Sequence, residues 1–557
     1  MTSALPRRAA LGALAAAVLA AAGCSDGSHR PKPAPSGAPT DARTDAPVPS
    51  GAAYTLRVLG GSELSDLQPV LDDAAKATGV TAKLTYTGTQ QGARTVGAGQ
   101  ADGVYDALWF ASNRYLRLDR TAAGKLLSET PVMVSPVAFG VRSPVLAALG
   151  WNPATVTWAQ IGTAVGQGRL TFGMTDPAQS NSGLSALIGL ASAFSGAQSA
   201  LTDADVAKAE PALRSFFAGQ KLTSGSSGWL AEAYQRAAKG GPGVRVDALV
   251  NYESVLLEYN RTLPNDAQLT VIRPADGVVT ADYPLALLSS AADQAKDAFH
   301  RLTAYLLRPE VQQKISDTTE RRPVTAGVSP GAGLATDPRP ELPFPGSREV
   351  ADGLLGAYQN QLRRPSRTAY VLDTSGSMAG PRLAALKTAL GALTGADGSP
   401  APDGFREREE ITLISFADTV KWTHVHQVPD TDPGQELAAI NADVQSLAAG
   451  GDTAIYSTLE AAYQLLAQQQ SAAGDDRFTS IVLMTDGENN RGATADRFTA
   501  FHQALPAAQQ AVPVFPIRFG EAAVSQLQGI ADLTGGKLFD GMSGSLGDVF
   551  EEIRGYQ

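Results

Sequence analysis

The chain has 557 residues, of which 43% are hydrophobic and 18% are charged. At roughly 150 residues per domain, this length excludes a single core and predicts several domains. The formal net charge is −10, which argues against nucleic acid as a partner because no basic surplus exists to neutralise phosphates. A single cysteine excludes an intrachain disulfide.

The N-terminus reads as an export signal over residues 1–23. Arg7 and Arg8 precede an apolar run from Ala9 to Ala22, which ends at Gly23 and Cys24. The alternative is a transmembrane anchor, but the run is shorter than the ~20 residues that span a bilayer. Cleavage is therefore favoured.

The end of this signal resembles the lipobox of bacterial lipoproteins at Ala22-Gly23-Cys24, and departs from it at Ala21, where Leu is usual. The resemblance implies that Cys24 is lipidated and becomes the mature N-terminus. The protein would then stand at the outer face of the cytoplasmic membrane, held by its lipid anchor alone. Residues 24–53 are rich in Pro, Gly, Ser and Ala, and this composition predicts a disordered tether.

From Tyr54 the pattern changes to strands that alternate with helices, which predicts an α/β domain with a largely parallel sheet. Strands are predicted over 54–59, 80–86, 104–110, 169–174, 244–250 and 269–273. Helices are predicted over 64–78 and 184–192.

Several turns in this region resemble those of a type 2 periplasmic solute-binding protein. They are Gly60-Gly61-Ser62, Gly88-Thr89, Trp109 with Ser112, Asp176-Pro177 followed by Ser180-Asn181-Ser182-Gly183, and Tyr252-Glu253. The resemblance covers residues 54–335. It implies two lobes that close on a small polar or anionic solute. The implied ligand contacts are Ser62, Thr89, Trp109, Ser112, Ser180, Asn181, Ser182, Tyr252 and Glu253.

The residues themselves leave alternatives open. Ser180 to Ser182 begin a predicted helix, whose free backbone N–H groups form a site for an anion or polar group. Simple helix capping explains the same residues equally well. Trp109 is also explained as a core aromatic, and Tyr252 with Glu253 as a turn after a strand.

Residues 336–366 are predicted to be a Pro-rich linker followed by a connecting helix, 348–362. Beyond it, residues 367–557 again alternate. Strands are predicted over 368–372, 410–416, 420–428, 478–485, 512–519 and 537–539, the second and third as a hairpin-like pair. With intervening helices, this pattern predicts a doubly wound sheet of about six strands.

Three strand and turn segments of this last domain deliver oxygen-bearing side chains. An apolar run ends in Asp373, with Ser375 and Ser377 after it; Thr453 follows a Gly-Gly turn; and Asp486 follows another apolar run. In open parallel sheets, ligands bind at the carboxyl ends of the strands. An all-oxygen set suits a hard cation such as Mg²⁺, Mn²⁺ or Ca²⁺. The alternative is that each residue only caps a turn.

The ordered set Asp-x-Ser-x-Ser, then Thr, then Asp resembles the metal-ion-dependent adhesion site of a von Willebrand factor type A domain. The resemblance implies a Rossmann-like doubly wound fold. It implies that Ser375, Ser377 and Thr453 contact the metal, and that Asp373 and Asp486 act mainly through water. An acidic residue of a protein partner would complete the metal's shell.

Together these patterns predict a membrane-tethered extracytoplasmic binding protein with a solute cleft and an adhesion module. An alternative is the receptor of a binding-protein-dependent transporter, with the last domain accessory. An enzyme has the least support. The formal Gly-x-Ser-x-Gly match at 327–331 lies in a Pro-rich loop, without the strand and helix that such a nucleophile needs.

Overall fold

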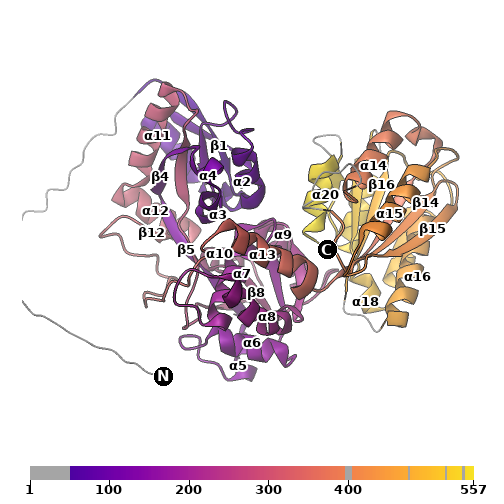
Figure 1. Ribbon diagram of the computed structural model, residues 1–557, viewed down its shortest axis with the longest axis horizontal. Helices are drawn as coiled ribbons and strands as arrows, with labels where there is room; N and C mark the ends of the chain where they lie inside the picture. The colour runs from indigo at the N-terminus through magenta and orange to yellow at the C-terminus, as the bar shows by residue number, and fades with distance from the viewer. Residues whose placement is uncertain (1–50, 396–403, 474–476, 521–522, 542–545, 557) are drawn as a thin grey trace, which may run out of the picture. The chain divides into compact units, whose positions relative to one another are not determined.

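The computed structural model describes residues 51–395, 404–473, 477–520, 523–541 and 546–556. The predicted signal peptide, Cys24 and almost all of the predicted tether lie outside these residues. The described residues form three β-sheets with helices packed against them (Figure 1). Within that part of the chain, no helix has both the length and the apolar character needed to cross a bilayer.

The first sheet is built around β1 (Tyr54–Gly60), where Leu56 and Val58 are fully buried. Its strand order is β2-β1-β3-β11-β4, in which β1 is parallel to both neighbours and β11 is antiparallel to both of its own. The other strands are β2 (Val80–Tyr86), β3 (Ala107–Trp109), β4 (Leu126–Pro131) and β11 (Pro284–Leu288). Its helices are η1 (Ser62–Leu67), α1 (Gln68–Thr78), α2 (Thr89–Gly97), α3 (Arg114–Leu118), α4 (Arg120–Ala123), α11 (Asp293–Leu306) and α12 (Pro309–Thr319).

The second sheet is built around β5 (Met133–Arg142), a ten-residue strand that the sequence analysis did not predict. Its strand order is β10-β5-β8-β6-β7, and β9 and β12 also pair with β5. Because nearly every residue of β5 is buried, its sequence shows no polar–apolar alternation. The other strands are β6 (Phe172–Thr175), β7 (Gln220–Ser224), β8 (Ala248–Tyr252), β9 (Leu269–Ile272), β10 (Thr280–Ala281) and β12 (Arg322–Pro323). Its helices are α5 (Ser143–Leu149), α6 (Trp158–Gly166), α7 (Asn181–Ser195), α8 (Asp203–Phe217), α9 (Ser227–Ala238) and α10 (Glu253–Asn260).

The chain passes directly from strand to strand between these two sheets, once from β4 to β5 and once from β10 to β11. The second crossover contains Tyr283, a buried non-glycine residue with a φ of +39°. Such a backbone conformation is strained and needs support from its surroundings. The indole Nε1 of Trp109 donates a 3.0 Å hydrogen bond to the Tyr283 carbonyl oxygen. The Arg321 guanidinium lies over the ring of Tyr283.

The segment predicted as a linker packs against the first two sheets' helices. It contains α13 (Arg348–Ala357) and the π-helical turn η2 (Tyr358–Leu362). The Tyr115 hydroxyl donates to Asp352 of α13 at 2.7 Å, and the Tyr358 hydroxyl donates to Gln220 at 3.2 Å. The segment therefore has specific tertiary contacts of its own.

The third sheet has the order β15-β14-β13-β16-β17-β18, and only its edge strand β15 is antiparallel to its neighbour. This result agrees with the predicted doubly wound sheet of about six strands. The strands are β13 (Ser366–Asp373), β14 (Glu410–Phe416), β15 (Val420–Gln427), β16 (Phe478–Thr485), β17 (Val514–Arg518) and β18 (Phe539–Asp540). The helices are η3 (Gly376–Met378), α14 (Pro381–Ala392), α15 (Gly434–Ser446), α16 (Ile455–Ala473), α17 (Ala495–Gln503), α18 (Ala507–Gln510), α19 (Val524–Thr534) and α20 (Leu546–Arg554).

Both faces of this sheet are buried, because alternate side chains of its strands enter two separate cores. Ala369 and Val371 of β13 pack with residues of α16, α17 and α19. Tyr370 and Leu372 belong to the core that includes residues of α14, α15 and α20. Figure 1 shows α16 and α20 on opposite sides of the sheet.

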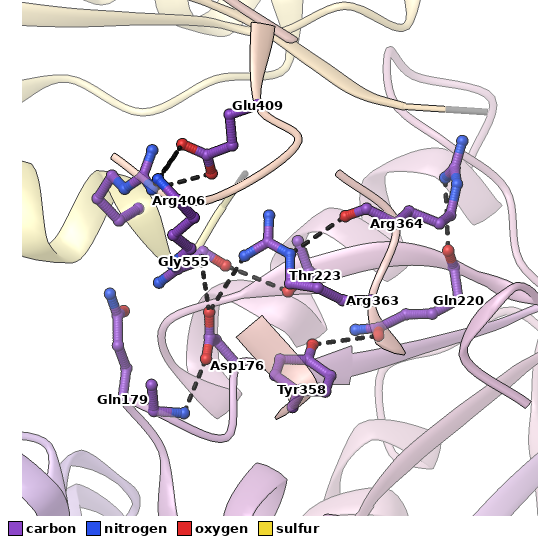
Figure 2. Close-up of polar contacts among 12 residues, drawn as sticks. Asp176, Gln179, Gln220, Thr223, Tyr358, Arg363, Arg364, Arg406, Glu409 and Gly555 are labelled. Carbon is purple, nitrogen blue, oxygen red and sulfur yellow. Dashed lines mark hydrogen bonds and ion pairs between the residues drawn. The ribbon is translucent and has the colours of Figure 1, made fainter. Parts of the chain in front are cut away.

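A cluster of buried charges connects the loop after β6 with the segments that flank β13 and β14. Asp176 lies 3.8 Å from Arg363 and 3.6 Å from Arg406, and all three side chains are buried. Figure 2 shows both guanidinium groups directed toward Asp176. Glu409 forms a 2.8 Å ion pair with Arg554. Burial, together with the neighbouring guanidinium groups, lowers the pKa of Arg406 to about 10.

Burial of His502 at the end of α17 makes the third sheet's domain sensitive to acid. The ring lies against Tyr463 and Phe498, and burial lowers the pKa of His502 below its ordinary value of 6.5. The unfolded chain therefore binds a proton at a higher pH than the folded chain, so stability falls as the pH drops below 6.5. Between pH 7 and 5 protonation of this group lowers the stability by at most about 2 kcal/mol.

We expect His502→Phe to lose less stability than wild type over this interval, measured as urea midpoints, whereas the exposed His300→Gln should match wild type. Equal losses in wild type and His502→Phe would contradict this assignment.

Candidate functional sites

Two strands of the third sheet end in carboxylates at the same rim. Strand β13 ends at Asp373, and Asp486 directly follows β16. The two strands are adjacent and parallel, with Leu372 opposite Met484. Because neighbouring parallel strands in this register end together, the two Asp residues are brought to one place.

The predicted hydroxyl residues gather around Asp486. The Ser375 and Ser377 hydroxyl oxygens are 3.0 Å apart, and the Ser377 hydroxyl donates to Asp486 Oδ1 at 2.8 Å. Thr453 reaches the same place, since a Cβ atom added at Gly487 would lie 3.3 Å from Thr453 Oγ1 and 3.8 Å from Ser377 Oγ. The structure thus assembles oxygen atoms from three distant chain segments.

Asp373 is fully buried and is held by two hydrogen bonds. Its Oδ1 accepts from the Ser375 backbone N–H at 2.8 Å, and its Oδ2 accepts from the Thr485 hydroxyl at 2.5 Å. Burial raises the pKa of Asp373 above its ordinary value. No cation among the described residues lies within ion-pair distance of it, so this buried carboxylate and the surrounding hydroxyls fit a hard cation.

Asp486 differs, because a cation of the protein already touches it. Arg382 of α14 donates from Nη1 to Asp486 Oδ2 at 2.5 Å, and 41% of the Arg382 side chain is exposed. The sequence analysis missed this residue. The one sequence feature that could have identified Arg382 is its position in the first turn of the helix that follows the Asp-x-Ser-x-Ser run. Considering described residues alone, no group of three or more His, Cys, Asp or Glu side chains is arranged to hold a metal.

The second candidate site is a cavity of about 280 Å³ between loops of the first and second sheets. Four of the nine predicted ligand residues line it: Ser62, Thr89, Ser180 and Asn181. Ser180 precedes α7, yet its side chain makes no capping bond to that helix. Its hydroxyl instead lies 3.0 Å from the Ser182 hydroxyl. The start of α7 therefore contributes Ser180 and Asn181 to the cavity wall.

The remaining predicted ligand residues lie behind that wall or elsewhere in the core. Trp109 is fully buried and bonds to Tyr283, while the Ser112 hydroxyl accepts from the Arg114 backbone N–H. The Ser182 hydroxyl lies 2.8 Å from that of Thr175. The Tyr252 hydroxyl accepts a 2.6 Å hydrogen bond from Asn181, so it supports a residue of the wall.

Glu253 is also buried, with ion pairs to Arg322 at 2.8 Å and to Arg273 at 3.4 Å. Arg322 belongs to β12, which pairs with β5, whereas Glu253 begins α10. The carboxylate therefore joins chain segments within the second sheet's domain. It is not among the residues that line the cavity.

The cavity has further wall residues that the sequence analysis missed. They include Glu63, Tyr86, Gln179, Ser226 and Ser227, and Glu551 and Glu552 of α20. Ser226 and Ser227 stand at the start of α9, directly after β7. The same order of strand, serine residues and helix occurs at Ser180 to Ser182. This repeated pattern could have identified Ser226 and Ser227 as wall residues from the sequence.

Two family models match separate parts of the chain. Residues 56–318 match the model for bacterial extracellular solute-binding proteins, and residues 368–488 match that of the von Willebrand factor type A domain. An uncharacterized protein of Synechocystis is 34% identical over 131 residues, which is 23% of this chain and 27% of that protein. The matched region thus spans about a quarter of that relative's length.

Three solved structures are similar to parts of the chain. The periplasmic binding protein P5PA is 15% identical and covers 56% of this chain and 99% of its own, with a TM-score of 0.43. AfuA of Actinobacillus pleuropneumoniae, solved with fructose-6-phosphate bound, is 13% identical with the same coverage and a TM-score of 0.44. A von Willebrand factor type A structure from Catenulispora acidiphila is 19% identical, covering 35% of this chain and 42% of its own, with a TM-score of 0.28.

We expect Glu253→Gln to destabilise the protein, because it removes the carboxylate that pairs with Arg322 and one of the two carboxylates, with Asp337, that pair with the buried Arg273. Breaking a buried ion pair costs about 3 kcal/mol, which corresponds to a fall of roughly 10 °C in melting temperature. The matched control is Glu210→Gln on α8, whose ion pair with Arg214 is exposed and should contribute less than about 0.5 kcal/mol. A melting temperature for Glu253→Gln equal to that of the control would contradict the structural role.

Proposed function

We propose that this chain, which contains an extracellular solute-binding domain followed by a von Willebrand factor type A domain, is an exported binding protein with two binding sites. One is a cleft for a small solute, and the other is a divalent cation site that captures an acidic side chain of a protein partner. The single observation that carries the second site is the hydrogen-bonded set of Ser375, Ser377 and Asp486 at the strand ends.

The cation site would use Ser375, Ser377 and Thr453 as direct oxygen ligands, with Asp373 and Asp486 acting through water. Mg²⁺ suits this set best, and Mn²⁺ and Ca²⁺ have similar ligand preferences. When bound, the ion supplies a positive charge that attracts a carboxylate. With two Asp carboxylates and the Arg382 guanidinium, a dication leaves one net positive charge, which favours an incoming Asp or Glu side chain.

The remainder of the proposal concerns attachment to the cell. Export agrees with the match to an extracellular family. Lipidation of Cys24 and tethering through residues 24–53 would hold both sites outside the cytoplasmic membrane.

Binding rather than catalysis is proposed for the cleft, because its wall residues are mainly hydroxyls, amides and carboxylates without a nucleophile–base pair among those described.

The cation site is tested by the melting temperature of the full chain in EDTA and in MgCl₂ or MnCl₂. We expect the divalent ion to raise the melting temperature, because an ion that binds only the folded chain stabilises it; at a concentration 100 times its dissociation constant the gain is about 2.7 kcal/mol. Asp373→Ala and Thr453→Ala should each abolish the increase.

The control for this experiment is Asp452→Asn. Asp452 is adjacent to Thr453, but its carboxylate pairs with Arg491 at the surface, so its response to the ion should equal that of wild type. An unchanged wild-type melting temperature in both ions, or equal loss of the response in Asp452→Asn, would contradict the proposed site. A pull-down from the cell envelope that requires the divalent ion would then identify the acidic partner.

The cleft is tested with a panel of sugars, amino acids, oxyanions and amines, followed by isothermal titration calorimetry of the full chain. We expect one class to bind saturably. Asn181→Leu should weaken that binding by roughly 10-fold or more, because it removes a polar group from the wall. The exposed Glu210→Gln should bind as wild type. Failure of the whole panel to bind would contradict a functional cleft.

A further inference from the structure

The solute cleft is larger than the cavity described above. A second cavity, of about 640 Å³, continues from it and shares the wall residues Ser62, Glu63, Tyr86, Ser226 and Ser227. The second cavity lies between η1 on one side and helices α9 and α10 on the other. The two cavities therefore form one cleft with two ends, one lined by the start of α7 and one by aromatic and acidic side chains.

The wall of this cleft is strongly acidic. Glu63, Asp66, Glu232 and Glu258 line the larger end, and Glu551 and Glu552 line the smaller end. Lys537 is the one basic side chain among the described wall residues, and it pairs with Glu552. An anionic solute would therefore meet repulsion from nearly every charged group of the wall.

Several of these carboxylates form no direct ion pair, although the Arg321 guanidinium attracts Glu63 and Glu258 from farther away. Glu63, Glu232 and Glu258 form no ion pair with any described residue. Asp66 pairs through Oδ2 with Arg321, but its Oδ1 is buried and accepts no hydrogen bond from the described chain. Burial raises the pKa values of Glu63 and Glu258. A bound cation would relieve this cost, because it stabilises their charged forms.

Aromatic rings line the same end of the cleft. Tyr86, Trp229 and Tyr259 belong to its wall, and Tyr86 is 45% exposed, which is unusual for a large aromatic side chain. Aromatic faces attract alkylated ammonium groups through the ring quadrupole, and they bind a fully hydrated inorganic ion poorly. Carboxylates and the exposed ring of Tyr86 in one cavity thus favour an organic cation over a metal ion.

We propose that the cleft binds a small organic cation, an amine or a quaternary ammonium compound. Its ammonium group lies between Glu63 and the ring of Tyr86, and its polar remainder lies toward Ser180 and Asn181. This inference rests on the proposed solute-binding function and narrows its ligand class. It replaces the small polar or anionic solute of the sequence analysis with a cationic one.

The test is calorimetric titration of the full chain in 150 mM NaCl with choline, putrescine and spermidine, each compared with phosphate, sulfate and glucose. We expect at least one of the three cations to bind saturably and the anions and glucose not to bind. Glu63→Gln should weaken the binding of that cation by roughly 10- to 100-fold, because it removes a partly desolvated charge–charge contact. Tyr86→Ala should weaken the binding of choline, because it removes the aromatic face. The control Glu210→Gln should not change the affinity for any of these compounds.

The outcomes separate this inference from the proposed function. Tyr86 is exposed, so its truncation should leave the melting temperature near wild type and should report on binding alone. Saturable binding of phosphate, sulfate or glucose without the cations would overturn the cationic ligand and leave the cleft functional. Cation binding that is unchanged in both Glu63→Gln and Tyr86→Ala would overturn the assignment to this cleft. Absence of binding by all six compounds would overturn both.

Discussion

The register between β13 and β16 is the constraint on which the candidate cation site depends. These two strands are parallel and adjacent, and they end at the same rim. Asp373 and Asp486, which are more than a hundred residues apart in the chain, therefore meet without any local sequence preference for doing so. The turn after β13 adds the hydroxyls of Ser375 and Ser377 at this rim, and the loop between α15 and α16 adds that of Thr453.

The balance of charge differs between the two sites, and this difference suits different ligands. At the strand ends, Asp486 already has a counter-ion in Arg382, whereas the buried Asp373 has none among the described residues. In the solute cleft, carboxylates outnumber basic side chains on the wall. The proposed dication would balance the charge of the first arrangement, and the proposed cationic solute that of the second.

Contacts between the two domains involve residues that lie near the solute cleft. Asp176 lies in the loop between β6 and Ser180, and it faces Arg363 and Arg406 (Figure 2). Helix α20 contributes Glu551, which pairs with Arg94 of α2, and also lines the cleft. Because buried charges are costly to separate, the contacts of Asp176 hold the loop before α7 against the segments that precede β13 and β14.

The sequence by itself determined the alternation of strands and helices, the doubly wound class of the third sheet and the five oxygen-bearing residues of its rim. It did so because apolar strand runs and the turns after them are local patterns. Only the tertiary structure decided that β5 is a central strand, that Trp109 and Tyr252 lie behind the cleft wall, and that Arg382 touches Asp486. It also assembled the acidic and aromatic wall from η1, α9, α10 and α20. Burial on both faces removes the alternation that reveals a strand, and the distance between side chains from different elements is fixed by packing, which no local pattern records.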